Sequence, residues 1–319
     1  MEQSFLAWLR GRTRSLPSVA VGIGDDAAVI DIPVGRQLIA TTDAIIDGVD
    51  FIVGEHELRD IGYKSIAVNL SDIAAMGASP LAALVTLSLP SEGATRTAAG
   101  LYEGILECAT EFGISIAGGD ISVYDGPLAI SVTLLGTVEA GQAWLRSGAK
   151  EGDAIVLTGP VGGSLLGRHL RPVPRIELVK RLRELGSVHA AIDISDGLSL
   201  DLDRLCASSG VGAELDLTSI PIHPDAVKRS KEVGGLPAID HALGDGEDFE
   251  LILAIDAATC EEWIRMRPEL SLHRIGTFVG RTGLWSKTAN DMKRLSPSGF
   301  IHGERRARAK QGSGDVASE

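Results

Sequence analysis

Cysteine is scarce in this sequence, and its pattern excludes two common kinds of cross-link. Cys108, Cys206 and Cys260 are far apart, and no two of them form a CxxC pair. A disulfide framework needs an even set of cysteines, whereas a zinc knuckle needs closely spaced ones. We therefore expect neither, and we expect a reducing compartment, the cytoplasm.

Long hydrophobic runs are also missing. No apolar stretch reaches the roughly 20 residues that a membrane-spanning helix needs. The first 14 residues are amphipathic and lack the apolar centre of an export signal. We expect neither a membrane span nor an export signal.

Positive charge is in deficit. The chain carries 43 acidic and 30 basic side chains, which gives a formal net charge of -13. Such a surface repels a nucleic-acid backbone, so nucleic acid is excluded as a partner. A protein of this charge that handles an anionic substrate needs metal cations or local Arg and Lys.

The familiar nucleotide-binding and catalytic motifs are absent. There is no GxxxxGK[ST] loop, and Gly22-x-Gly24 lacks the third glycine of a dinucleotide-binding turn. The histidines form no HExxH pattern, and no Ser or Cys lies in a nucleophile elbow.

The 319 residues and their alternating patterns predict two mixed α and β domains. We place the first at 1–140, the second at 141–304 and a disordered tail at 305–319, which lacks apolar periodicity. Periodicity predicts helices at 4–12, 58–76, 95–112, 175–185, 198–208 and 257–265. It predicts strands at 18–21, 27–30, 37–41, 81–89, 114–117, 128–138, 154–158, 190–192, 213–217 and 249–254.

Acidic motifs are the main chemical feature of the chain: GDD at 24–26, TTD at 41–43, NLSD at 69–72, GGD at 118–120, DISDG at 193–197 and GED at 246–248. Each alone is typical of a turn or a helix cap. Asp43, Asp120 and Asp193, however, each follow a predicted apolar strand, and such strand ends form ligand sites in α/β proteins. Asp72 lies among Ala, Ile and Met in a predicted helix, where a charge requires a partner.

Convergence of these carboxylates would require cations. Clustered acids raise one another's pKa, and ligands that offer only oxygen favour Mg²⁺ over Zn²⁺. Bound ATP would add about four negative charges, so we expect several Mg²⁺ ions to bind together with the nucleotide.

Eight motifs in order resemble those of the thiamine-monophosphate kinase family, which belongs to the wider group of aminoimidazole ribonucleotide synthetase. They are GIGDDAAV at 22–29, ATTD at 40–43, AVNLSDIAAMGA at 67–78, AGGD at 117–120, RSGAKEGD at 146–153, RPVPR at 171–175, IDISDGL at 192–198 and GDGEDFEL at 244–251. The resemblance extends to about residue 300.

The resemblance implies a reaction, a fold and a set of site residues. The reaction is ATP- and Mg-dependent phosphorylation of thiamine monophosphate to thiamine diphosphate by in-line transfer. The fold is α+β, with an N-terminal sheet that pairs across a homodimer and a C-terminal α/β sandwich. The metal ligands implied are Asp26, Thr41, Thr42, Asp43, Asp72, Asp120, Asp193 and Asp196, of which Asp43, Asp72 and Asp120 form the central catalytic bridge. ATP is implied to contact Tyr102, Gly119, Asp120, Arg146 and Ser195, and the substrate to contact Glu247 and Phe300.

The chain departs from the family at Asp50, which stands where the family usually has His. An ionised Asp accepts hydrogen bonds and repels a phosphate, so Asp50 would face a cationic thiazolium or a metal. The C-terminal stretch 298–303 is also a weaker match. Two alternatives therefore stay open: an enzyme of the same superfamily with a different acceptor, and a non-catalytic sensor of Mg-nucleotide.

Overall fold

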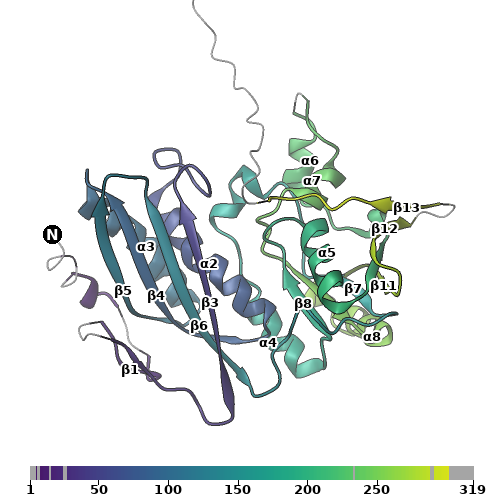
Figure 1. The fold of residues 1–319 in the computed structure, drawn as a ribbon, viewed down its shortest axis with the longest axis horizontal. Helices are drawn as coiled ribbons and strands as arrows, with labels where there is room; N and C mark the ends of the chain where they lie inside the picture. The colour runs from purple at the N-terminus through teal and green to yellow at the C-terminus, as the bar shows by residue number, and fades with distance from the viewer. Residues whose placement is uncertain are drawn as a thin grey trace, which may run out of the picture.

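The computed structural model describes residues 5, 8–13, 16–23, 27–232, 234–287 and 291–301. Two α/β domains lie side by side (Figure 1), one built on a four-stranded sheet and the other on a seven-stranded sheet. The predicted fold class of two α/β domains is confirmed. Of the helices that the structure describes, none combines the length and apolarity that crossing a bilayer requires.

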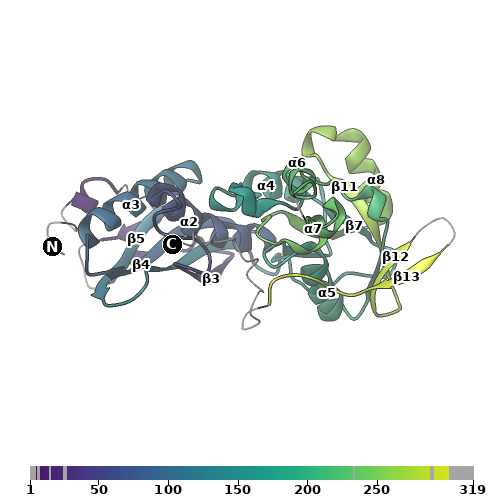
Figure 2. The ribbon, with the colours of Figure 1, turned by 90° about the horizontal axis from the view of Figure 1, so that it is seen from above.

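The first sheet has the strand order β3-β6-β4-β5, in which β4 and β5 run parallel. Its strands are β3 (Arg36–Ile46), β6 (Ala129–Glu139), β4 (Ser79–Pro90) and β5 (Ser115–Tyr124). Helices α2 (Leu58–Ala75) and α3 (Ala94–Glu111) lie along one side of this sheet, as Figure 2 shows. The opposite face exposes Leu38, Ile46 and Leu84. A separate hairpin of β1 (Val19–Val21) and β2 (Val29–Ile30) packs Val19 against the sheet.

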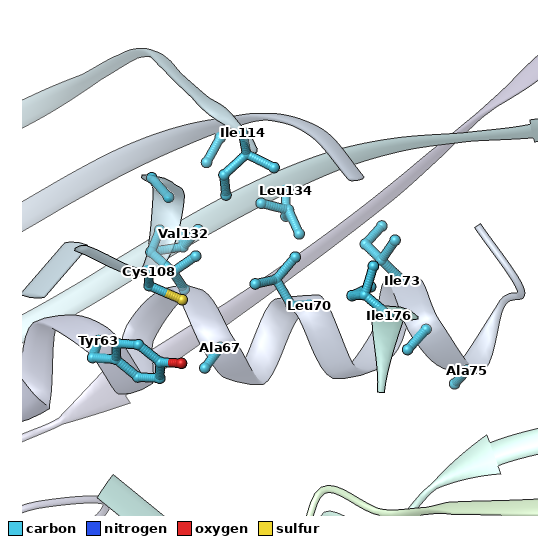
Figure 3. Packing of buried hydrophobic residues seen from close by; sticks show 14 of the residues in the cluster. Tyr63, Ala67, Leu70, Ile73, Ala75, Cys108, Ile114, Val132, Leu134 and Ile176 are labelled. Carbon is cyan, nitrogen blue, oxygen red and sulfur yellow. The ribbon is translucent and has the colours of Figure 1, made fainter. Parts of the chain in front are cut away.

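Helix α2 is buried on nearly every side because it lies between the two domains. Leu70 and Ile73 pack against Val132 and Leu134 of β6, while Ile176 of the second domain lies beside Ile73 (Figure 3). The apolar core of the first domain is therefore continuous with one layer of the second. This position of α2 explains why its polar residues meet residues of both domains.

The second sheet has the order β13-β12-β9-β11-β7-β10-β8. Its strands are β7 (Ala154–Leu157), β8 (Ala190–Asp193), β9 (Gly212–Leu215), β10 (Leu251–Ile255), β11 (His273–Val279), β12 (Gly283–Lys287) and β13 (Met292–Leu295). Helices α4 (Ile176–Leu185) and α8 (Ala257–Met266) share one apolar layer with it. Helices α5 (Leu198–Ser209) and α7 (Ala238–Gly244) share the other layer, and α6 (Pro224–Arg229) packs on α7. Short 3-10 turns are η1 (Ser164–Leu166), η2 (Arg168–Leu170), η3 (Leu217–Ser219) and η4 (Pro268–Leu270).

The long predicted elements match the observed ones within two residues at each end, but two strands are longer than predicted. Because β3 continues to Ile46 and β5 to Tyr124, Asp43 and Asp120 lie within strands, and the prediction that they follow strand ends is wrong. Asp193 does end its strand, β8. The tail at 305–319 and Asp26 lie outside the described residues.

Candidate functional site

The junction between the domains brings together acids that are distant in sequence. On β3, the Thr41 hydroxyl donates a hydrogen bond to Asp72 of α2, with an Oγ1–Oδ2 distance of 2.5 Å. The residue before Asp72 on α2 is Ser71, and its hydroxyl donates a hydrogen bond to Asp193 of β8 at 2.7 Å, across the domain boundary. The two hydroxyls therefore orient one carboxylate from each domain.

Electrostatics shows that these acids interact. Burial and then the neighbouring charge of Asp72 raise the pKa of Asp193 to about 8, although the Ser71 hydrogen bond and Arg146 oppose the rise. Burial also raises the pKa of Asp72, against the Thr41 hydrogen bond and Arg146. Arg146, an exposed side chain, is thus the cation that acts on both acids.

Asp43 belongs to the same charged region. It is partly open to solvent, yet desolvation raises its pKa to about 6, with contributions from the charges of Asp72 and then Asp50. Acids that raise one another's pKa in this way favour the binding of a cation, which would remove their repulsion. Oxygen donors alone fit Mg²⁺.

A cavity of about 370 Å³, the junction cavity, opens beside these acids. Residues of both domains line it, including the predicted site residues Asp43, Asp50, Ser195, Asp196, Glu247 and Phe300. Six positions spread over most of the chain therefore share one cavity. The Asp50 carboxylate accepts a hydrogen bond from the Ile46 amide at 2.8 Å and so closes the turn after β3.

The loop after β8 carries Ser195 and Asp196, and Asp201 shapes it. Asp201 Oδ2 accepts hydrogen bonds from the backbone amides of Ser195, Asp196 and Gly197, at 2.9 to 3.1 Å. Arg204 pairs with Asp196 at 2.5 Å and with Asp201 at 2.7 Å. The predicted ligand Asp196 is therefore held by an arginine in this structure.

A second cavity, of about 840 Å³, lies along β5, β4 and β6 of the first sheet, and we call it the edge cavity. Its lining includes three of the predicted ATP contacts: Tyr102, Gly119 and Asp120. Gly119 fits there because a Cβ atom would lie 1.8 Å from the Val85 carbonyl oxygen, so β4 and β5 could not approach as they do. Ser195 lies in the junction cavity instead.

The structure does not bring Asp120 to Asp43 within one chain. The register aligns Asp43 with Val132 and Val85, whereas Asp120 aligns with Thr86. Adjacent residues of a strand point to opposite faces, so the two acids lie on opposite faces of the sheet. They also occupy its two edge strands, three strand spacings or roughly 14 Å apart.

Thr42 also lies apart from the junction acids, because adjacent residues of a strand point to opposite faces of the sheet. Its hydroxyl donates to the Val132 carbonyl and accepts from Thr133, on the face opposite to Thr41 and Asp43. Within the ranges that the structure describes, no three His, Cys, Asp or Glu side chains form a ready-made metal site. A metal at the junction would therefore need further ligands.

The sequence reasoning missed Lys64, which is the central cation of the junction cavity. Its side chain is only 1% exposed and bonds to Glu247. His56 and His169 line the same cavity, and their rings pack edge to face with centroids 5.8 Å apart. The available signal for Lys64 was a charge within the helix that carries Asp72, a position that calls for a buried partner.

Most of the chain matches known protein domains. Residues 24–138 match the model of the AIR synthase related protein, N-terminal domain, and residues 150–284 match that of the corresponding C-terminal domain. A thiamine-monophosphate kinase from Rhodopirellula baltica is 56% identical over 318 residues, with coverage of 95% of this chain and 98% of the relative.

Solved structures agree with this result. Thiamine-monophosphate kinase from Stenotrophomonas maltophilia superposes with a TM-score of 0.77 at 36% identity, covering 88% of this chain and 94% of that one. AaThiL complexed with AMPPCP and TMP gives a TM-score of 0.75 at 30% identity, covering 88% and 91%. On these matches, the chain belongs to the thiamine-monophosphate kinase family and is built from the two AIR synthase related domains.

Proposed function

We propose that this protein phosphorylates thiamine monophosphate to thiamine diphosphate with ATP and Mg²⁺. The observation that supports this most is the junction cavity, where Asp43, Asp50, Glu247 and Phe300 meet. A structural relative binds AMPPCP and TMP, which are an ATP analogue and an acceptor for such a reaction. The two cavities of this chain offer room for two such ligands.

The junction cavity suits an acceptor with a cationic ring and a phosphate. Glu247 and Asp50 supply negative charge toward a thiazolium, and Phe300 supplies an apolar surface for a ring. The phosphate end would lie toward Asp43, where cations offset the charge of the acids. The acceptor phosphate is already anionic near neutral pH, so the transfer requires no strong general base.

Magnesium would be held by Asp43, Asp72 and Asp193, with the Thr41 hydroxyl. Phosphate oxygens and water would complete its ligands, which is common for this ion. Bound there, Mg²⁺ would neutralise the charge that the two phosphates bring together. Thr41 and Ser71 keep the two buried carboxylates oriented, and Arg146 adds a positive charge on the nucleotide side.

On the nucleotide side we propose Tyr102, Gly119 and Asp120, which line the edge cavity. Asp120 cannot join Asp43 within one chain, because the sheet separates them. We therefore propose that the enzyme is a homodimer in which the edge cavity of one subunit faces the junction cavity of its partner. The exposed apolar side chains on the open sheet face support such a pairing.

The test is turnover with defined substrates. Incubation with ATP, Mg²⁺ and thiamine monophosphate should yield ADP and thiamine diphosphate in equal amounts. ATP that is chirally labelled at its γ-phosphorus should give a product with inverted configuration, as a single in-line transfer requires. ADP formation only with another acceptor would point to changed specificity at Asp50, and tight Mg-ATP binding without any turnover would point to a sensor.

A further inference from the structure

We propose that Lys64 is a positioning residue of the junction cavity, which holds Glu247 and the turn around Asp50 in place across the two domains. The inference rests on the proposed function and deepens it, because it assigns a residue that sets the affinity for the acceptor. Lys64 lies on α2 of the first domain, and Glu247 lies in the loop before β10 of the second. Both line the junction cavity.

The geometry leaves Lys64 fully engaged with protein groups. Its Nζ atom donates to Glu247 Oε1 at 3.0 Å, to Glu247 Oε2 at 2.9 Å and to the Asp50 carbonyl oxygen at 2.9 Å. An ammonium group has three hydrogens, so these bonds use all of its donors. Lys64 therefore acts through Glu247 and the turn, and does not need to contact the substrate itself.

Burial makes this arrangement specific. The Lys64 side chain is 1% exposed, whereas that of Glu247 is 24% exposed and so reaches the cavity. A buried ammonium without a carboxylate partner is strongly unfavourable, so Lys64 confines Glu247 to this position. Glu247 is thus the solvent-facing end of a buried ion pair.

The backbone around Glu247 shows why such an anchor is required. Glu247 has a φ of 52° and Phe249 a φ of 53°, in the left-handed region that residues other than glycine seldom adopt. The loop is bonded to its own domain by the Glu247 amide, which donates to the Ser195 carbonyl at 2.7 Å. Lys64 adds the bond to the other domain, and so the strained loop and the Asp50 turn face one another at a fixed spacing.

The first experiment compares Lys64→Met and Lys64→Arg with the wild type in steady-state kinetics. We expect Lys64→Met to raise KM for thiamine monophosphate by about tenfold or more, with kcat and KM for ATP changed by less than about threefold, because ground-state positioning is lost. Lys64→Arg keeps the charge and should recover most of the affinity. Lys180→Met, an exposed lysine on α4, serves as the matched control and should behave as the wild type.

The second experiment is a double-mutant cycle with Glu247→Gln. If Lys64 acts through Glu247, Lys64→Met should raise KM by less than about twofold when Glu247→Gln is already present, because coupled residues are not additive. The double variant replaces a buried ion pair by a neutral pair, so it remains testable even if Lys64→Met alone fails to fold.

Two results would overturn the inference: a KM of Lys64→Met within about twofold of the wild type, or effects of Lys64→Met and Glu247→Gln that multiply in the cycle. Multiplying effects would mean that Lys64 acts independently of Glu247. Absence of thiamine diphosphate formation by the wild type would instead reject the proposed function, so the two failures are distinguishable.

Discussion

At the scale of single residues, the junction contains acids whose charges oppose one another before any ligand binds. Desolvation and the charges of Asp72 and Asp50 all act against ionisation of Asp43. A site of this kind stores electrostatic repulsion that a cation can release. Neutralising one of these acids should therefore lower turnover but raise the free energy of unfolding of the ligand-free protein.

Asp43→Asn tests this opposition. The folded pKa of about 6 lies above the usual value of 3.8, so the penalty is absent below pH 3.8, grows as the pH rises and is complete above about pH 6. Without Mg²⁺ at pH 8, Asp43→Asn should therefore raise the free energy of unfolding, by about 1 kcal/mol after allowance for solvent screening. Turnover at saturating Mg²⁺ should fall by about a hundredfold or more.

Urea unfolding and a turnover assay measure the two effects. Asp31→Asn, at an exposed position that lines neither cavity, is the control. Near wild-type turnover of Asp43→Asn would reject its role with the metal.

His169 predicts a separate pH effect. Burial, and then the charge of Lys64, lower its pKa from 6.5 to about 4. Between pH 6.5 and pH 4 the His169 imidazole is protonated in the unfolded chain but neutral in the folded protein. The free energy of unfolding therefore falls as the pH drops through this range. Between pH 7.5 and pH 5 we expect this group to account for a loss on the order of 1 to 2 kcal/mol, allowing for screening.

His169→Asn should lack this part of the loss, as urea unfolding at the two pH values would show. Its amide can still donate to the Ser164 carbonyl, which lies 3.1 Å from the His169 Nδ1 atom. His273→Asn on β11 is the control. Equal pH dependence of His169→Asn and the wild type would contradict the assignment.

At the scale of elements, the close approach of α2 and α3 positions the helix that carries Lys64 and Asp72. A Cβ atom on Gly104 would lie 1.7 Å from the Arg59 carbonyl oxygen, and one on Gly62 would lie 2.0 Å from that of Leu101. Each glycine thus lets one helix backbone touch the other. Loss of this contact would shift α2 against both domains.

Gly104→Ala should therefore destabilise the protein by about 2 to 3 kcal/mol, because the backbones must separate. Gly100→Ala on the same helix is the matched control. Its added methyl would first meet the Leu58 side chain, with Cδ1 at 2.9 Å and Cβ at 3.0 Å, so we expect a smaller change, of about 1 kcal/mol. Chemical denaturation measures the free energy of unfolding of both variants. Equal losses would show that the close approach of the two helix backbones is not the cause of the destabilisation.

Prediction from the sequence succeeded best at this scale and failed where strands were long. Helices 58–76 and 95–112 have local patterns, and each is followed by a glycine in the left-handed region, Gly77 or Gly113. Strands β3 and β5 continue past the predicted ends because hydrogen bonds to β6 and β4 stabilise polar residues such as Asp43 and Asp120 within the ladder. The strands β11 to β13 were missed. Strands β11 and β12 pair with β7 and β9, which are distant in sequence, whereas β13 pairs with the neighbouring β12 but is short and mostly exposed.

At the scale of the whole molecule, one chain separates acids that the proposed reaction would use together. A homodimer that shares its sites would join Asp43 of one subunit with Asp120 of the other. Asp43→Asn and Asp120→Asn should each be inactive alone. Co-expressed, they should recover about a quarter of wild-type activity, because half of the dimers are mixed and each mixed dimer has one intact site.

If each variant carries a different affinity tag, the mixed dimers can be purified through both tags and their turnover measured. Recovery should appear only in the mixed dimers, and two variants of the same residue, Asp43→Asn with Asp43→Ala, are the control without recovery. Absence of activity in the mixed dimers would show that the sites are not shared.

Local periodicity and short motifs were enough to predict the two α/β domains, the long helices, the family and the acids that the proposed chemistry would use. The folded chain settles which of these acids meet. It placed Asp72 beside Asp193 and Asp120 on the far face of the sheet, and it buried Lys64 against Glu247. Strand register and the packing of α2 between two domains fix these neighbours, and both depend on contacts between residues that are far apart along the chain.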